Sequence, residues 1–131
     1  MPTLPDSYRD LLTAPGVVIL TTINPDGTPQ TSALWFLLDE DGKLKLSLNR
    51  SRQKAKNLER NPNVTLFFID LNNPYRTLEV RGKAVVDPDG SALAEKVSAK
   101  YGSRVQDNDR PGEQRIAVTI EPTKVNTFPP A

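Results

Sequence analysis

The sequence predicts a mainly β fold with short helices and a mostly antiparallel sheet. Short β-branched or alternating apolar runs recur along the chain, and tight turn signals join most of them. Only three segments have helical spacing. A chain of 131 residues suits one domain, so we expect residues 1–131 to form a single unit. Many short strands in one small domain are typical of a barrel or sandwich with helices at its ends.

The expected strands are rich in apolar residues and are bounded by turn residues. The clearest alternates Leu44, Leu46 and Leu48 with polar residues, as in a strand that is buried on one face. Asp-Gly turns within 24–29 and 39–43 connect the first strands as hairpins. The expected strands are residues 17–23, 30–39, 43–49, 63–70, 76–86, 114–122 and 123–128.

Three helices are expected between these strands. The second ends before Pro62, because proline keeps the preceding residue out of the helical region. The third carries Leu93, Val97 and Tyr101 at every fourth position, which gives it one apolar face. The polar segment 102–113 is expected to be a mobile loop. The expected helices are residues 4–12, residues 51–61 and a segment that has Asp87 as its N-cap.

The composition excludes several classes of function. The chain has no cysteine and no histidine, which excludes disulfides, thiolate nucleophiles, Ser-His-Asp catalysis and the usual zinc sites. We therefore expect no catalytic side chain and no metal site, and the chemistry would fall to a bound cofactor or to carboxylates. A net charge of +1 argues against non-specific nucleic-acid binding.

The apolar runs are too short for a membrane span. The first ten residues, MPTLPDSYRD, have neither a basic start nor an apolar core, so we expect no signal peptide. The expected location is cytoplasmic.

The segment NRSRQKAKNLERNP, residues 49–62, is unusually basic for this chain. It carries a positive charge on every second residue, at Arg50, Arg52, Lys54 and Lys56. The second helix is expected to start here, with Asn49 or Ser51 as its cap. Cations at a helix N-terminus oppose the helix dipole at about 0.3–1 kcal/mol each. Such a local conflict is typical of functional sites, and free N–H groups and cations together favour an anion. The alternative interpretation is a solvated surface.

The order of motifs along the chain resembles that of the flavin/deazaflavin oxidoreductase superfamily. These motifs are DGTPQTS, a strand that ends in WF, the basic segment, NPYRTLEVRGKA and IEPTKV. The resemblance covers residues 14–128. It implies the split β-barrel of pyridoxamine 5'-phosphate oxidases, and the chain is most similar to F420-dependent reductases of the FDOR-B type. It also implies a homodimer with the cofactor at the interface, and a small-molecule substrate.

The resemblance also assigns residues to the cofactor site. It places the phosphate on Arg52 and Lys54, supported by Arg50 and Asn57. It places the isoalloxazine or deazaflavin ring along the strand after DGTP and beside the end of the next strand. We expect the NPYR loop of the partner subunit to complete the site. The ring and loop residues are Gln30, Ser32, Ala33, Trp35, Ser47, Asn49, Tyr75 and Arg76. Taken alone, the aromatic residues among them could instead be packing residues, and the first two could be exposed strand residues.

The basic segment differs from that of pyridoxamine 5'-phosphate oxidases in one respect that bears on the expected activity. Pyridoxamine oxidases carry adjacent Ser-Arg-Lys in this segment, whereas Gln53 separates Arg52 from Lys54 here, and the chain has no histidine. Oxidation of pyridoxamine phosphate is therefore not expected.

The leading hypothesis is an F420H2-dependent reductase. It would transfer a hydride from reduced deazaflavin to the conjugated double bond of a small apolar acceptor, such as an unsaturated lactone, a coumarin-like ring or a quinone. The alternatives are an FMN-dependent oxidoreductase and a non-catalytic protein that stores a flavin or deazaflavin. The long basic track favours coenzyme F420, whose tail carries several carboxylates.

Overall fold

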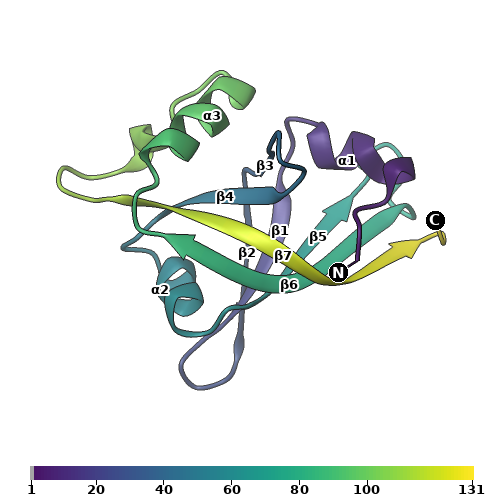
Figure 1. Ribbon diagram of the computed structural model, residues 1–131, viewed down its shortest axis with the longest axis horizontal. Coiled ribbons are helices and arrows are strands. Elements are labelled where there is room, and N and C mark those ends of the chain that lie inside the picture. Colours follow the sequence, from purple (N-terminus) through teal and green to yellow (C-terminus); the bar gives the residue numbers. More distant parts are fainter. Residues whose placement is uncertain (1) are drawn as a thin grey trace.

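The computed structural model describes residues 2–131 and contains a seven-stranded sheet with the order β2-β1-β5-β6-β7-β4-β3 (Figure 1). All neighbouring strands are antiparallel. The sheet curls strongly, which confirms the predicted mainly β split barrel (Figure 1). The strands are β1 (Val18–Ile23), β2 (Pro29–Leu34), β3 (Leu37–Leu38), β4 (Leu44–Asn49), β5 (Asn63–Ile69), β6 (Thr77–Asp87) and β7 (Arg115–Phe128).

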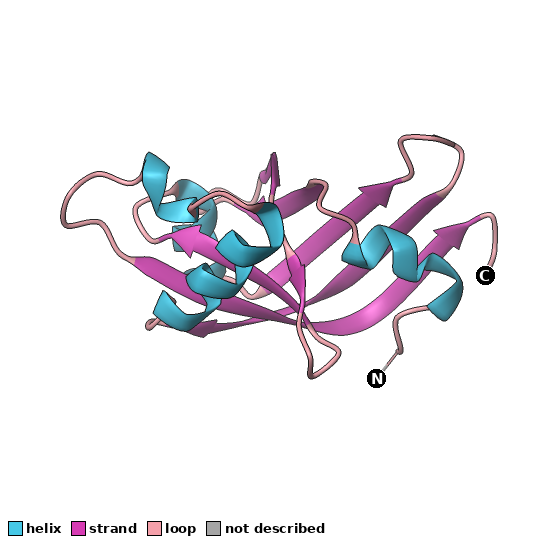
Figure 2. Ribbon diagram, turned by 90° about the horizontal axis from the view of Figure 1, so that it is seen from above, coloured by secondary structure: helices cyan, strands magenta, loops and turns pink. Residues whose placement is uncertain are grey.

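The helices gather at the two ends of the sheet (Figures 1 and 2). At one end lie α2 (Gln53–Arg60) and α3 (Ser91–Tyr101), together with the 3-10 turn η2 (Val105–Asn108). At the other end lie α1 (Arg9–Thr13), the preceding turn η1 (Asp6–Tyr8) and both chain termini. No helix in residues 2–131 is long and apolar enough to cross a membrane.

The leucine side chains that alternate along β4 lie in the main hydrophobic core. Leu44, Leu46 and Leu48 are each at most 1% exposed. A second, smaller cluster lies beneath α3 and includes Val97 and Val105, with Trp35 packed against it. The segment 102–113, predicted to be a mobile loop, contains the 3-10 turn η2, whose first residue, Val105, is buried.

Two strand predictions differ from the structure. Residues 30–39 form β2 and β3 rather than one strand, because Trp35 and Phe36 leave the sheet between them. Conversely, the two strands expected in 114–128 form the continuous β7, since β6 offers it partners from Ala117 to Phe128 and β4 pairs with its first residues. A register shift at Arg81/Gly82 absorbs the irregularity, and Pro122 lies opposite Gly82.

The predicted cap of α3 is also wrong. Asp87 is the last residue of β6, and the N-cap position is Gly90. The carboxylate of Asp89 accepts hydrogen bonds from the backbone N–H and the hydroxyl of Ser91. The two turn residues after Asp87 therefore delay the start of the helix.

Asp39 links the turn before β4 to α3. Its carboxylate lies 2.7 Å from Lys45 Nζ and 3.1 Å from Lys96 Nζ, and the hydrogen bond from Lys45 lowers the pKa of Asp39 to about 2. We expect Asp39→Asn to lower the free energy of unfolding by about 1–2 kcal/mol at neutral pH. A lowered carboxylate pKa stabilises the fold above about pH 4, and this stabilisation is lost as the pH falls towards 2.

Urea denaturation at several pH values measures this effect. The difference between wild type and Asp39→Asn should shrink as the pH falls from about 4 to 2. Asp41→Asn is the matched control, because Asp41 also contacts Lys45 but its side chain is 47% exposed. An equal loss in both variants would contradict a special role for Asp39.

Candidate functional site

The candidate site is a pocket of about 360 Å³ where β2, β4, α2 and the segment before β7 meet. Its volume lies in the range of small-ligand sites, about 300–1,000 Å³. The lining combines three cationic side chains with a set of apolar ones. The cationic residues are Arg52, Lys54 and Arg115, and the apolar ones include Val17, Leu34, Trp35, Val97 and Val105.

The helix that carries the basic segment starts at this pocket. Its N-cap is Arg52, with extended backbone (φ −78°, ψ 150°) and no side-chain cap. The expected caps, Asn49 and Ser51, instead form the preceding turn, in which Asn49 Oδ1 accepts hydrogen bonds from the Ser51 N–H and hydroxyl. The first helical turn has no acidic residue, so nothing of its own balances the dipole and the cations.

The two central cations lack acidic partners. Within residues 2–131, no ion pair includes Arg52 or Lys54. Lys54 Nζ instead donates to Ser32 Oγ at 3.3 Å. Burial lowers the pKa of Lys54, and the charges of Arg52 and Arg115 lower it further. An anion would relieve this repulsion and accept charge-assisted hydrogen bonds.

Ser47 provides a second sign that the pocket fits a polar ligand. Its side chain lines the pocket, and the residue is only 8% exposed. Ser47 Oγ is one of two buried side-chain polar atoms in the described residues without a hydrogen-bond partner. Because an unmade hydrogen bond costs about 1–3 kcal/mol, a ligand polar atom at this position would be stabilising. A cofactor that carries a phosphate and ring heteroatoms fits this donor set.

Arg115 is a pocket residue that the sequence analysis missed. It makes a two-pronged ion pair with Asp109, at 2.8 and 2.9 Å, and donates to Ser47 O at 3.1 Å. The hydrogen bond from Arg115 is the main cause that lowers the pKa of Asp109. Asn49 also donates to Asp109 and to Glu113, at 2.9 and 3.2 Å. The segment before β7 is therefore fastened to the end of β4, beside the pocket.

Some predicted residues lie together and others do not. Six of them line this pocket, namely Ala33, Trp35, Ser47, Asn49, Arg52 and Lys54, and Ser32 touches it through Lys54. Arg50 pairs with Glu59 at 3.1 Å and lines a different hollow.

Asn57 and Gln30 have structural contacts of their own. Asn57 is completely buried and donates to Thr22 and Asn24, which ties α2 to β1 and the following turn. Gln30 accepts a hydrogen bond from Thr22. Neither Asn57 nor Arg50 lines this pocket, and a supporting role for them in phosphate binding stays a prediction.

The NPYR loop lies apart from the pocket. Arg76 pairs with Asp10 and Asp70 and stacks on the ring of Tyr8, 4.4 Å from its centroid. Tyr75 is 77% exposed, so the alternative that it is a packing residue is wrong. A contribution of these residues to the site of a partner subunit stays a prediction.

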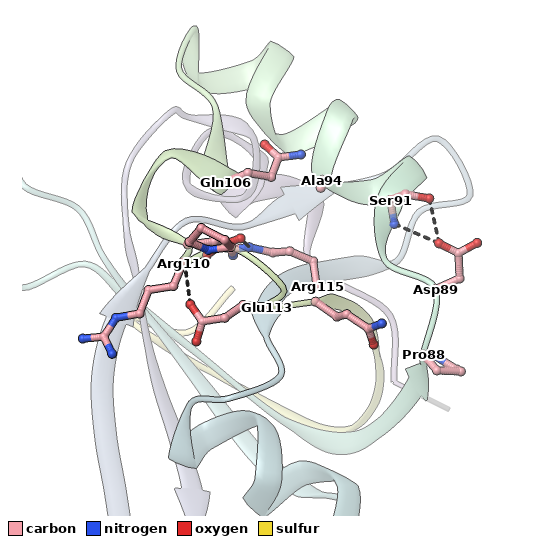
Figure 3. Close-up of a pocket in the computed structure, with 11 residues that line it drawn as sticks. Pro88, Asp89, Ser91, Ala94, Gln106, Arg110, Glu113 and Arg115 are labelled. Carbon is pink, nitrogen blue, oxygen red and sulfur yellow. Dashed lines mark hydrogen bonds and ion pairs between the residues drawn. The ribbon is translucent and has the colours of Figure 1, made fainter.

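A larger hollow of about 720 Å³ lies beyond Arg115, between α3 and the segment before β7 (Figure 3). Its carboxylates are already engaged: Asp109 pairs with Arg115, Glu113 accepts from Ser51, and Asp89 accepts from Ser91. In Figure 3 the guanidinium of Arg110 points away from the other labelled side chains. We therefore place the candidate site in the smaller pocket, where Arg52 and Lys54 have no acidic partner among the described residues.

Together, the curled antiparallel sheet and this pocket define a split-barrel protein with a candidate anion site. The family described as Pyridoxamine 5'-phosphate oxidase matches residues 4–128. The chain belongs to this family, which confirms the predicted superfamily.

Solved structures agree with this assignment. An F420 reductase is 35% identical, with a TM-score of 0.80 and coverage of 94% of this chain and 98% of that chain. A conserved hypothetical protein from Mycobacterium tuberculosis is 24% identical, with a TM-score of 0.75 and coverage of 95% and 84%. General stress protein 26 from Bacillus anthracis is 20% identical, with a TM-score of 0.74 and coverage of 96% and 94%. The last two show the fold alone. A comparison with curated protein sequences found no match.

Proposed function

We propose that this protein is an oxidoreductase that uses reduced coenzyme F420 to reduce the conjugated double bond of a small apolar acceptor. One observation carries the proposal: Arg52 and Lys54 are unpaired cations in a pocket that also presents an apolar wall around Trp35. The similarity to an F420 reductase at 35% identity favours the deazaflavin over FMN.

Each part of the pocket has a role in this proposal. Arg52, Lys54 and the first N–H groups of α2 hold the phosphate, and Ser47 Oγ offers a hydrogen bond to the polar edge of the ring. Reduced deazaflavin would supply the hydride when it is bound. The apolar residues Val17 and Trp35 exclude water and keep a planar ring in place. No acidic side chain is required, since the final proton can come from solvent.

We propose a homodimer with the cofactor at its interface, as the resemblance to the superfamily implies. In that assembly the exposed Tyr75 is a candidate to reach the partner's pocket. Light scattering of the purified protein, with and without cofactor, measures the mass directly. A monomer in both conditions would contradict this part of the proposal.

Fluorescence titration tests the choice of cofactor. We expect saturable binding of F420 that quenches the intrinsic fluorescence, and weaker binding of FMN. Binding of FMN with none of F420 would refute the leading proposal and support an FMN-dependent enzyme. Steady-state turnover with F420H2 and a panel of enones and quinones separates catalysis from storage, because a storage protein binds the cofactor without turnover.

We expect the Arg52 side chain to bind the cofactor at the expense of the stability of α2. Its backbone has the geometry of an N-cap, but its side chain makes no cap hydrogen bond. We expect Arg52→Ser to raise the free energy of unfolding above that of Arg52→Ala by about 0.5–2 kcal/mol, because serine can cap the helix. Both variants should lose cofactor affinity alike. Thermal unfolding and titration of the two variants measure both quantities, and equal stability would contradict the cap geometry.

A further inference from the structure

The interruption between β2 and β3 is held by the last turn of α3. Tyr101 Oη accepts a hydrogen bond from the Phe36 N–H at 3.1 Å and donates to Gly16 O at 2.7 Å. One hydroxyl therefore joins three segments: the end of α3, the residue before Val17, and the residue after Trp35. These hydrogen bonds replace the ladder bonds that Phe36 loses where the sheet is interrupted.

The ring of Tyr101 packs against Trp35, the residue before Phe36. It stacks on Trp35 with ring centroids 4.4 Å apart and planes 5° from parallel. The β1–β2 ladder ends at the pair of Val18 and Leu34, and Val17 and Trp35 are the residues next to that pair. Both Val17 and Trp35 line the candidate pocket, whereas Tyr101 stands behind them. The hydroxyl and the ring of Tyr101 therefore fix two neighbouring wall residues.

Lys100 adds a third tie. Its Nζ donates to Phe36 O at 2.8 Å and lies 3.7 Å from the centroid of the Phe36 ring and 5.0 Å from that of Tyr101. Within residues 2–131 this ammonium has no ion-pair partner. Burial lowers the pKa of Lys100 to about 8, so the half-buried charge is costly to keep. An ammonium that contacts a main-chain carbonyl and two rings but no carboxylate holds Phe36 in place at a cost in stability.

We propose that Tyr101, assisted by Lys100, is the positioning residue that holds Trp35 and Val17 as the flat wall for the cofactor ring. The inference rests on the proposed function for the identity of the ligand, but it assigns a role to α3 that the pocket lining alone does not. Removal of the hydroxyl should loosen the wall without removing any group that touches the ligand.

The single tryptophan makes the test direct, because all indole fluorescence reports on Trp35. Tyr101→Phe keeps the stacked ring and removes only the hydroxyl. Tyr8→Phe is the matched control: the Tyr8 hydroxyl donates to Pro129 O at 2.6 Å, and Tyr8 belongs to η1, which lies at the other end of the sheet from α3. Lys100→Met, which keeps most of the side chain, is the second test variant. Acrylamide quenching of the apoprotein and titration with F420 and FMN are measured for all four proteins.

We expect Tyr101→Phe to make Trp35 about twofold or more easier to quench and to weaken cofactor binding about 3–10-fold, because a loosened wall must be ordered when the cofactor binds. Lys100→Met should act in the same direction, and Tyr8→Phe should match wild type in both measurements. Unchanged quenching in Tyr101→Phe and Lys100→Met overturns the inference, and so does altered quenching with unchanged affinity.

The two proposals can fail separately. A wild-type protein that binds neither cofactor refutes the proposed function. Quenching of the apoprotein then still decides whether Tyr101 positions Trp35, since that measurement needs no ligand.

Discussion

Replacement of Arg52 and Lys54 together by alanine should lower cofactor affinity by at least about 100-fold. Hydrogen bonds to charged groups contribute about 1.5–3 kcal/mol each, and two of them correspond to two to four orders of magnitude in Kd. The fold should not suffer, because neither side chain has an acidic partner to leave behind, and Lys54 gives up only the contact with Ser32. Fluorescence titration gives Kd, and thermal unfolding checks that the variant is folded.

The basic segment supplies its own matched control. The double variant Arg50→Ala/Lys56→Ala also removes one arginine and one lysine from the same 14-residue segment. Arg50 pairs with Glu59, away from the pocket, and Lys56 is exposed. We expect FMN affinity to change less than about threefold, because salt screens exposed charges beyond about 10 Å. A selective loss of F420 affinity in this control would place the tail of F420 along the outer side of α2. Equal losses in both double variants would mean that net charge, not the pocket, binds the cofactor.

The sequence predicted the parts of the site whose signal is local. The alternation of Leu44, Leu46 and Leu48 predicted the apolar face of β4, which is buried, although Ser47 and Asn49 on the other face are buried as well. The stop at Pro62 then located α2 within one or two residues. The conflict of its cations with the helix dipole marked the basic segment as a whole. The choice of Arg52 and Lys54 within it came from the resemblance to the superfamily.

Longer-range parts could not be predicted in this way. Arg115 reaches the pocket only because β7 pairs with β4, so that Arg115 lies opposite Asn49, and no local pattern encodes that pairing. Regular alternation in the basic segment likewise could not show that Arg50 turns to Glu59. The interruption at Trp35 and Phe36 depends on Tyr101, 65 residues away from Phe36. The candidate anion-binding residues thus lie in a segment with a local sequence signal, whereas the apolar wall depends on contacts between distant segments.

Gly90→Ala should be the most damaging small substitution for the apolar half of the site. Gly90 N–H donates to Arg115 O at 3.0 Å, where α3 docks on the start of β7. A Cβ atom at Gly90 would lie 2.5 Å from Arg115 O and 2.6 Å from Ile116 C, and both are backbone atoms that cannot rotate away. Because the φ of Gly90 is −98°, the penalty is steric and not conformational. We expect a loss of about 1–3 kcal/mol in the free energy of unfolding.

Gly90→Ala should also weaken ligand binding at the candidate site, because α3 relieves the clash by moving away from β7. That movement displaces Val97 in the pocket wall and Tyr101 behind Trp35, so the cofactor should bind more weakly and Trp35 should be easier to quench. Gly16→Ala is the control, because a Cβ there meets nothing within 4 Å, and its stability should be unchanged or raised by up to about 1 kcal/mol. Urea denaturation and Trp35 quenching measure the two effects. A Gly90→Ala protein as stable as Gly16→Ala would show that α3 does not dock on β7 as closely as this geometry requires.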